Sequence, residues 1–230
     1  MSKITLIDDG AAFEVLVLKT AKPTHVVLFA AGSGGSPDRH LSLLTSLTEQ
    51  GCTVIAPYFD RLVTPTPSAE DLLLRAKRLR LALDSFAADL EAPVVGVGHS
   101  IGATLLLGLA GGQAWMRDGQ RLPIPHDRKI EKLVLFAPPT GYFQAPGALE
   151  AVRIPIQAWV GSADSITPSA QIELLRRQLN APASLDLHVI EGAGHFSFMN
   201  TLPPQIADPM PDRKEFLGKL AAEVGRFITA

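Results

Sequence analysis

The sequence predicts an α/β protein with a mostly parallel sheet of about eight strands and helices on both faces. Short runs rich in Val, Ile and Leu alternate along the chain with longer stretches of helical periodicity. Hydrophobic residues make up 47% of the 230 residues and charged residues 19%, which is enough apolar material for a well-packed core. No repeat or break in composition divides the chain, so we expect a single domain over residues 1–230.

The predicted strands are short apolar runs bounded by turn residues. The first two, Ile4–Ile7 and Phe13–Leu18, are separated by Asp8-Asp9-Gly10, which favours a hairpin. The later strands are His25–Ala30, Thr53–Ala56, Val94–Val97, Leu133–Phe136, Ile156–Val160 and Leu185–Ile190.

The predicted helices lie between these strands and have recognisable starts. Ser36-Pro37 and Thr167-Pro168 each place a hydroxyl before a proline, which is typical of a capped first turn. Ser68 and Asp71 have the spacing of a capping box. Further helices are expected from about Ser100 and from Asp212.

Strand-to-helix turns of a parallel sheet meet at one edge, because the crossovers are right-handed. Ligands of open α/β sheets bind at this edge. The candidate turns follow Ala30, Val97, Val160 and Ile190.

Composition disfavours several classes of function. The net charge is -2 and no Lys/Arg block stands out, so we expect no nucleic-acid partner. A lone cysteine, Cys52, cannot form a disulfide within the chain, and it is expected to be a buried apolar side chain. No apolar stretch is long enough to cross a bilayer, and the first residues lack the apolar core of a signal peptide. We therefore expect a cytoplasmic protein with no membrane partner.

Metal and cofactor sites have no support in the sequence. The histidines outside the motifs below, such as His25 and His40, lack partners at metal-ligand spacing. We expect no metal and no cofactor. The sequence leaves undecided whether the chain forms a homodimer through an edge strand or the last helix.

Ser100 lies in Gly98-His99-Ser100-Ile101-Gly102, between a predicted strand and a predicted helix. Gly-x-Ser-x-Gly in this setting is typical of a nucleophilic serine on a sharp turn, since the glycines let neighbouring backbone approach. The start of the helix supplies free N–H groups that favour a developing oxyanion. The alternative for this pattern taken alone is a glycine-rich turn with a capping serine.

The pattern and its setting resemble the α/β-hydrolase superfamily, and the resemblance covers essentially the whole chain. It implies a compact serine hydrolase without a large cap, similar in size to the dienelactone-hydrolase-like and small esterase or thioesterase branches. The dienelactone-hydrolase branch has a cysteine where this chain has Ser100, which disfavours carboxymethylenebutenolidase activity. In this superfamily the nucleophile, the acid and the histidine follow in that order along the chain.

Two later turns match this order. Residues 159–168, Trp-Val-Gly-Ser-Ala-Asp-Ser-Ile-Thr-Pro, resemble the acid turn and make Asp164 the expected acid. Residues 191–196, Glu-Gly-Ala-Gly-His-Phe, resemble the histidine turn and make His195 the expected general base. The resemblance implies that Asp164 holds the imidazole tautomer. The alternative for Asp164 is a carboxylate that only tightens its turn.

The glycine-rich loop after the third predicted strand is where the superfamily often has His-Gly-x-Gly. Ala31 stands in the place of that histidine, which matters little because the oxyanion donor is a backbone N–H. The expected donors are the N–H groups of Ser33 and Ile101, with Gly32 or Gly34 as alternatives to Ser33.

The expected substrate-binding residues are Gly32, Gly34, Tyr142 and Phe196. The chain between Ser100 and Asp164 is too short for a large helical cap, which predicts an open site for a small or flexible substrate. The leading function is hydrolysis of an ester or thioester through an acyl-enzyme. Peptide or lactone hydrolysis and acyl transfer use the same machinery and stay open.

Two other functional classes are alternatives. One is a noncatalytic binding protein on an α/β-hydrolase scaffold, with the triad kept but little turnover. The other is a dinucleotide-binding oxidoreductase, suggested by the same glycine-rich loop and by a strand that ends near Asp60. Pro37 stands where the Gly-x-Gly-x-x-Gly fingerprint needs its third glycine, which weighs against the oxidoreductase.

Overall fold

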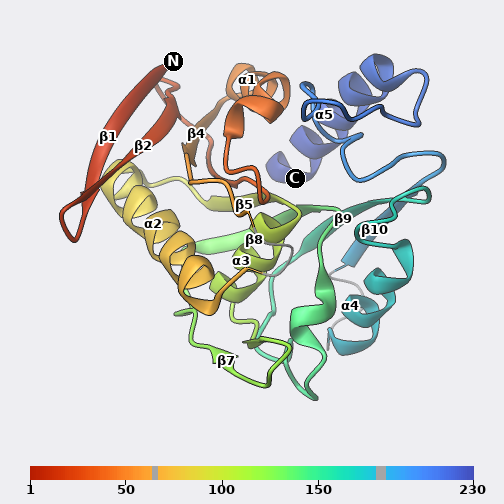
Figure 1. The fold of residues 1–230 in the computed structure, drawn as a ribbon. Helices are drawn as coiled ribbons and strands as arrows, with labels where there is room; N and C mark the ends of the chain where they lie inside the picture. The colour runs from red at the N-terminus through yellow and green to blue at the C-terminus, as the bar shows by residue number, and fades with distance from the viewer. Residues whose placement is uncertain (64–66, 180–184) are drawn as a thin grey trace.

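A computed structural model describes residues 1–63, 67–179 and 185–230. In this part of the chain the main sheet has eight strands in the order β1-β2-β4-β3-β5-β8-β9-β10 (Figure 1). The strands are β1 (Ser2–Asp8), β2 (Ala11–Leu18), β3 (His25–Ala30), β4 (Cys52–Pro57), β5 (Val94–His99), β8 (Ile130–Phe136), β9 (Ile156–Gly161) and β10 (Leu185–Ile190).

The first two strands form the predicted hairpin at one edge of the sheet. Asp8 pairs with Ala11, so Asp9 and Gly10 alone make the turn. Both have positive φ, 47° and 84°, which matches the right-handed twist of the strands. β2 is also antiparallel to β4, whereas every pairing from β4 across to β10 is parallel. The fold is therefore the mostly parallel α/β sheet that the alternation predicted.

Helices cover both faces of this sheet. They are α1 (Leu41–Glu49), α2 (Ala69–Ala87), α3 (Ile101–Leu109), α4 (Ile172–Gln178) and α5 (Arg213–Thr229). Leu79 of α2 and Leu106 of α3 belong to one buried apolar cluster, and Leu44 of α1 and Val224 of α5 belong to the other. Figure 1 shows α1 and α5 on one side of the strands and α2 and α3 on the opposite side.

The predicted starts of the helices are correct in part. Ser68 and Asp71 form the expected capping box of α2. Ser36 caps a 3₁₀ turn, Pro37–His40, and the α-helix begins only at Leu41. Asp212 precedes α5 without a side-chain cap.

The prediction that Thr167 caps a helix was wrong. Pro168 is followed by the 3₁₀ turn Ser169–Gln171, and α4 begins at Ile172. The Thr167 hydroxyl donates its hydrogen bond to Asp164 instead.

The carboxyl ends of β3 and β5 lie side by side, with Ala30 paired with Gly98. From β3 the chain crosses to β4 on one side, and from β5 it continues to β8 on the other. This reversal is the topological switch point, where crevices form in open α/β sheets. The loop after β3 and the turn at Ser100 therefore lie next to each other.

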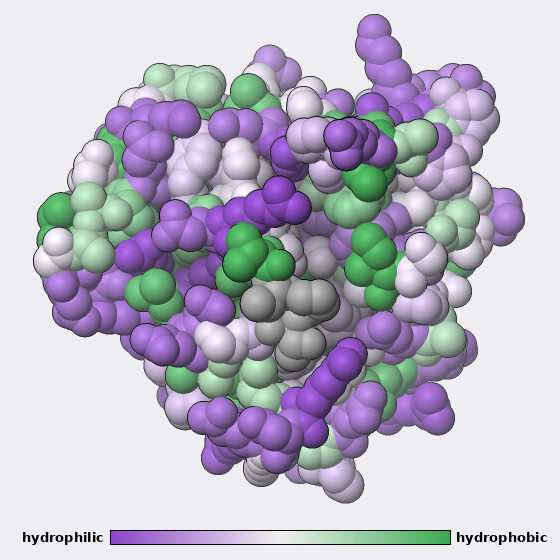
Figure 2. Space-filling model, in the orientation of Figure 1, coloured by the Kyte–Doolittle hydropathy of each residue, from purple (hydrophilic) through white to green (hydrophobic). Residues whose placement is uncertain are grey.

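The edge of the sheet carries no large cap in the described residues. Between α3 and β8 the chain forms a small hairpin, β6 (Ala114–Trp115) with β7 (Arg121–Leu122), which the sequence patterns did not predict. Figure 2 shows one face of the molecule on which hydrophilic residues predominate and hydrophobic residues lie in separate spots. Within the described ranges, no helix combines the length and hydropathy needed to traverse a bilayer.

Candidate active site

Ser100 sits on a strained turn between β5 and α3. Its φ of 53° and ψ of -127° are unusual for a residue with a side chain. Cβ atoms added at the flanking glycines would collide with backbone: one at Gly98 would lie 2.8 Å from the Ala103 nitrogen, and one at Gly102 would lie 2.1 Å from the Ala30 oxygen. The two glycines therefore allow the close packing that holds Ser100 in this conformation.

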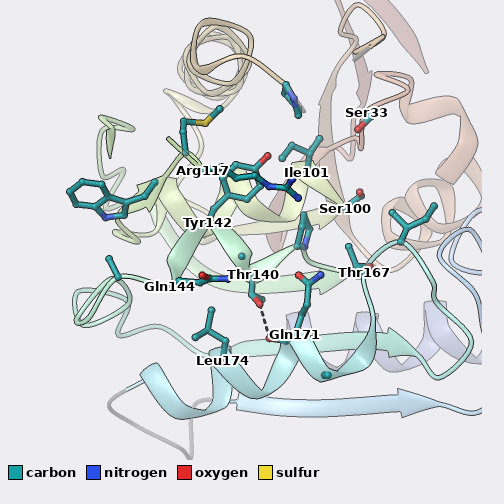
Figure 3. Close-up of a pocket in the computed structure, with 18 of the residues that line it drawn as sticks. Ser33, Ser100, Ile101, Arg117, Thr140, Tyr142, Gln144, Thr167, Gln171 and Leu174 are labelled. Atoms are coloured by element: carbon teal, nitrogen blue, oxygen red, sulfur yellow. Dashed lines mark hydrogen bonds between the residues drawn. The ribbon is translucent and has the colours of Figure 1, made fainter. Parts of the chain in front are cut away.

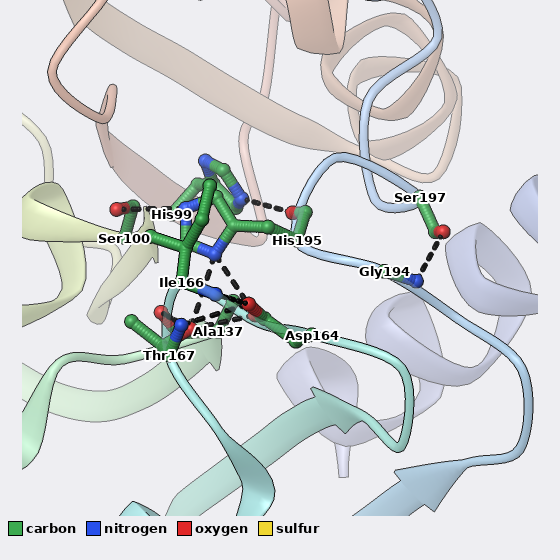
Figure 4. Close-up of polar contacts among 9 residues, drawn as sticks. All are labelled: His99, Ser100, Ala137, Asp164, Ile166, Thr167, Gly194, His195 and Ser197. Carbon is green, nitrogen blue, oxygen red and sulfur yellow. Dashed lines mark hydrogen bonds and ion pairs between the residues drawn. The ribbon is translucent and has the colours of Figure 1, made fainter. Parts of the chain in front are cut away.

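Three loops bring Ser100, His195 and Asp164 into one hydrogen-bonded chain (Figure 4). His195 Nε2 lies 3.0 Å from Ser100 Oγ, and His195 Nδ1 lies 2.8 Å from Asp164 Oδ2. Asp164 and His195 are 4% and 7% exposed, whereas Ser100 faces a cavity and is half-buried. The three predicted side chains thus meet although Asp164 and His195 lie far from Ser100 in the sequence.

The environment of Asp164 keeps its carboxyl group ionised. Burial raises the pKa of Asp164, but hydrogen bonds from His195 and Thr167 outweigh burial and hold it below its usual value. The N–H groups of Ile166 and Thr167 both donate to Asp164 Oδ1 at 2.8 Å. An ionised carboxylate only accepts hydrogen bonds, so His195 carries its proton on Nδ1. His195 Nε2 is then free to accept the proton of Ser100.

Thr167 belongs to this site, whereas the sequence analysis assigned it to the start of a helix. Its hydroxyl donates to Asp164 Oδ2 at 2.6 Å and lies 3.1 Å from His195 Nδ1. Thr167 is 4% exposed and also lines the cavity beside Ser100. The Thr-Pro pair concealed this role because it is also a common helix start. The Thr167 hydroxyl binds Oδ2 of Asp164, whereas the backbone N–H groups of Ile166 and Thr167 bind Oδ1. Both oxygens of the carboxylate are therefore held in place.

The acid loop and the histidine loop are also joined through their backbones. The Ala163 N–H donates to the Ala193 carbonyl at 2.9 Å, and the Gly192 N–H donates to Ser162 Oγ at 2.9 Å. A Cβ added at Gly161 would lie 2.0 Å from the Ala193 oxygen, so only glycine permits this contact. The spacing between Asp164 and His195 is therefore fixed by the loops as well as by the side chains.

His99 contacts both the backbone and the ring of His195. Its Nε2 donates to the main-chain carbonyl of His195 at 2.9 Å, and the two ring centroids are 4.9 Å apart. His40 packs on the other side of His99, with ring centroids 5.1 Å apart. Both His99 and His40 are buried.

Burial keeps both of these histidines neutral. It lowers the pKa of His40 to about 3, with a further contribution from the charge of Arg39. Burial also lowers the pKa of His99 well below its ordinary value, and His195 and His40 add to that shift. Neither His40 nitrogen has a hydrogen-bond partner in the described ranges.

Ser33 and Ile101, the expected oxyanion donors, both lie beside Ser100. Both line the same cavity as Ser100, and Ile101 is the first residue of α3. In the part of the chain that the structure describes, neither backbone N–H makes a hydrogen bond. Two free donors beside a nucleophilic serine are what an oxyanion hole needs.

Arg75 of α2 fixes the loop that carries Ser33. Its guanidinium donates to the carbonyls of Gly32 at 2.9 Å, Ser33 at 3.3 Å and Asp60 at 2.5 Å. Arg75 is 3% exposed and stacks on the Phe59 ring, 5.0 Å from its centroid. In a trans peptide the N–H points opposite the carbonyl, so holding the Gly32 carbonyl directs the Ser33 N–H away from Arg75. No sequence motif indicated this role.

A cavity of about 830 Å³ opens beside Ser100 (Figure 3). Its wall includes Tyr142, as predicted, but not Gly32, Gly34 or Phe196. Gly32 is buried under the turn that carries Ser100, where an added Cβ would lie 3.2 Å from Ser100 Cβ. Gly34 is exposed, and Phe196 packs edge-on against His195. The remaining wall residues come mainly from the segments after α3, β8 and β9.

The loop after β3 is not arranged like a dinucleotide-binding turn. It leads into a 3₁₀ turn in which Ser36 Oγ already accepts from the Asp38 N–H. No open N-terminus of an α-helix follows the glycines to receive a pyrophosphate, as that alternative requires. Across the described residues, no group of three or more His, Cys, Asp or Glu side chains is placed to hold a metal ion.

Solved structures that share this fold include α/β-hydrolases. One is an α/β serine hydrolase homologue from Coxiella burnetii, with a TM-score of 0.66 and 16% identity, covering 99% of this chain and 95% of the other. Another is a thermophilic esterase from Thermogutta terrifontis, with a TM-score of 0.67 and 16% identity, covering 97% and 90%. A third is a dienelactone hydrolase from Anabaena variabilis, with a TM-score of 0.67 and 20% identity, covering 98% and 94%. No protein-family model matches the chain, and comparison with curated proteins found no match.

Proposed function

We propose that this chain, which has the α/β-hydrolase fold, is a serine hydrolase that cleaves a small or flexible ester or thioester. The observation that carries the proposal is the hydrogen-bonded chain from Ser100 through His195 to Asp164. The fold alone would leave the function open, because one fold serves many functions. The geometry of the three side chains and the cavity that Ser100 faces support catalysis by a nucleophile.

In the first half of the reaction, Ser100 Oγ attacks the carbonyl carbon of the substrate while His195 Nε2 takes the Ser100 proton. The imidazolium that forms is stabilised by the ionised Asp164. The carbonyl oxygen gains negative charge and is bound by the N–H groups of Ser33 and Ile101. His195 then returns the proton to the leaving alcohol or thiol as the acyl-enzyme forms.

In the second half, water replaces the alcohol or thiol. His195 takes a proton from the water, which attacks the acyl-enzyme, and Ser100 is released with its proton restored. An acyl-enzyme route suits esters and thioesters because both provide a leaving group that accepts one proton. No large cap covers the cavity in the described residues, so water can reach the acyl-enzyme.

Turnover of a chain-length series tests this function. We expect hydrolysis of p-nitrophenyl esters and of N-acetylcysteamine thioesters with short to medium acyl chains, and the loss of both activities in Ser100→Ala. Cys52→Ser is the matched control, because Cys52 is buried in the core away from the site and burial raises its thiol pKa to about 11. A folded wild-type protein that turns over no member of the series would contradict the proposal and favour a noncatalytic binding protein.

A further inference from the structure

The cavity beside Ser100 has a positively charged wall. Arg117, from the turn between β6 and β7, and Arg177, from the last turn of α4, both line it. Within the described residues, no Asp or Glu contributes to this wall. A neutral ester needs no cation near the reacting serine, so the charges indicate something more about the substrate.

Arg117 is exposed, and its guanidinium makes neither an ion pair nor a hydrogen bond to any residue that the structure describes. The adjacent acid, Asp118, is exposed and accepts the Gln120 N–H at 3.0 Å within the hairpin turn. An exposed guanidinium on the wall of the Ser100 cavity can donate two hydrogen bonds to an anion. Its charge is therefore available to an anion that the protein itself does not supply.

Arg117 also lies where a substrate group attached to the reacting carbonyl would pass. Figure 3 shows its guanidinium beside Tyr142, on the side of the cavity that faces Ile101 and Ser100. Burial raises the pKa of Tyr142 and the positive charge of Arg117 opposes that rise, which places the two groups within electrostatic range. The Tyr142 hydroxyl is a second donor beside the guanidinium.

We propose that the substrate carries an anionic group, a carboxylate or a phosphate, which Arg117 binds while Ser100 attacks the ester or thioester bond. This inference rests on the proposed hydrolase function. The planar guanidinium can donate two parallel hydrogen bonds to either anion, so it orients the substrate as well as attracting it. Arg177, which is exposed and lines the same cavity, adds to the positive field.

Two matched pairs of substrates test the charge and locate it. Mono-p-nitrophenyl glutarate and p-nitrophenyl valerate differ by a carboxylate on the acyl side. On the leaving-group side, butyryl-coenzyme A carries phosphates, together with adenosine and the pantoyl part, that S-butyryl-N-acetylcysteamine lacks. We expect kcat/KM for the anionic member of at least one pair to exceed that of its neutral partner about tenfold or more, and to fall as ionic strength rises.

Three variants assign the preference to Arg117. Arg117→Met should reduce the ratio of anionic to neutral kcat/KM about tenfold, mainly through KM, and Arg117→Lys should restore part of it because the charge remains. Arg121→Met is the matched control: Arg121 is an exposed arginine of the same hairpin that does not line the cavity, so its loss should leave the ratio unchanged.

The outcomes separate this inference from the proposed function. A preference confined to the glutarate places the anion on the acyl group, and one confined to coenzyme A places it on the leaving group; either supports the inference. Equal rates within both pairs, or a preference that persists in Arg117→Met, would overturn it while the hydrolase function stands. A folded protein that hydrolyses none of the four compounds removes the function and the inference together.

Discussion

His195 Nδ1 lies 2.8 Å from Asp164 Oδ2, and the contact is almost closed to solvent because the two residues are 7% and 4% exposed. A buried hydrogen bond of this length to an ionised carboxylate fixes both the orientation and the tautomer of the imidazole. The tautomer matters because only an unprotonated Nε2 can accept the proton of Ser100. In the proposed mechanism, the reactivity of Ser100 therefore depends on the carboxylate of Asp164.

Replacing Asp164 with asparagine should lower kcat for p-nitrophenyl acetate by roughly three to four orders of magnitude. The amide keeps the shape of the side chain but can offer its N–H₂ to Nδ1, which favours the tautomer with the proton on Nε2. Circular dichroism and thermal unfolding should show a folded protein. Turnover equal to wild type in a folded Asp164→Asn protein would mean that the acid lies elsewhere.

Replacing Thr167 with valine removes one hydroxyl hydrogen bond from Asp164 while keeping the side-chain shape. We expect kcat to fall roughly tenfold, because the two N–H donors of the turn still hold the carboxylate. Thr167→Ser should retain most of the activity, since it keeps the hydroxyl. Equal losses in the valine and serine variants would show that the methyl group, and not the hydroxyl, matters at this position.

Replacing Arg75 with methionine should release the carbonyls of Gly32 and Ser33 and leave the Ser33 N–H misdirected. Loss of an oxyanion donor lowers kcat by about two orders of magnitude, with a smaller effect on KM, because the donor acts on charge that develops in the transition state. Arg75→Lys should restore part of kcat, since an ammonium can bind one or two of the three carbonyls.

Arg78→Met is the control for the Arg75 variants. Arg78 is also a buried arginine of α2, but it pairs with Asp8, away from Ser100. Both methionine variants should lose stability, and only Arg75→Met should lose kcat at temperatures where both proteins are folded. Equal kcat losses in the two would show that Arg75 acts through general stability alone.

The buried histidines predict sensitivity to acid. The pKa of His40 is about 3 in the folded protein against an ordinary 6.5, so between these pH values the unfolded chain binds more protons. The contribution of neutral His40 to the free energy of unfolding is therefore fully present well above pH 6.5, and it is lost as the pH falls toward 3. His40 contributes a loss of about 2 kcal/mol between pH 7.5 and pH 5.

His40→Phe should reduce this dependence, because phenylalanine fills the space between Phe29 and His99 without a titrating group. Urea unfolding at the two pH values measures it. We expect the drop in unfolding free energy to be smaller in the variant by about 2 kcal/mol. An identical drop in wild type and variant would mean that His40 is not the group that takes up the proton.

The parts of the fold and site that could be predicted from sequence are those with local signatures. Alternating apolar runs indicated the strands, and Gly98-His99-Ser100-Ile101-Gly102 indicated the turn that holds Ser100. Asp164 and His195 were predicted because the turns after two late strands resemble the acid and histidine turns of the α/β-hydrolase superfamily, and strands of a parallel sheet end at one edge. These inferences needed the order of elements, the chemistry of their ends and that resemblance.

The parts that were missed depend on contacts between distant segments. Arg75 lies in the middle of an amphipathic helix, and nothing in the local pattern shows that it reaches the carbonyls of Gly32 and Ser33. Thr167 was assigned to a cap because Thr-Pro is common at helix starts, whereas its hydroxyl is used by Asp164. Phe196 follows His195 directly, but its ring packs against the imidazole and not into the cavity. Side-chain direction at such turns is set by tertiary packing.

The most direct measurement of the central claim is covalent capture of the nucleophile. A fluorophosphonate probe, followed by intact-protein and peptide mass spectrometry, should give one adduct per chain, located on Ser100. His195→Ala should label far more slowly, and Ser100→Ala should not label. An unlabelled wild-type protein that is folded by circular dichroism, or an adduct on any other residue, would contradict the assignment of Ser100 as the nucleophile.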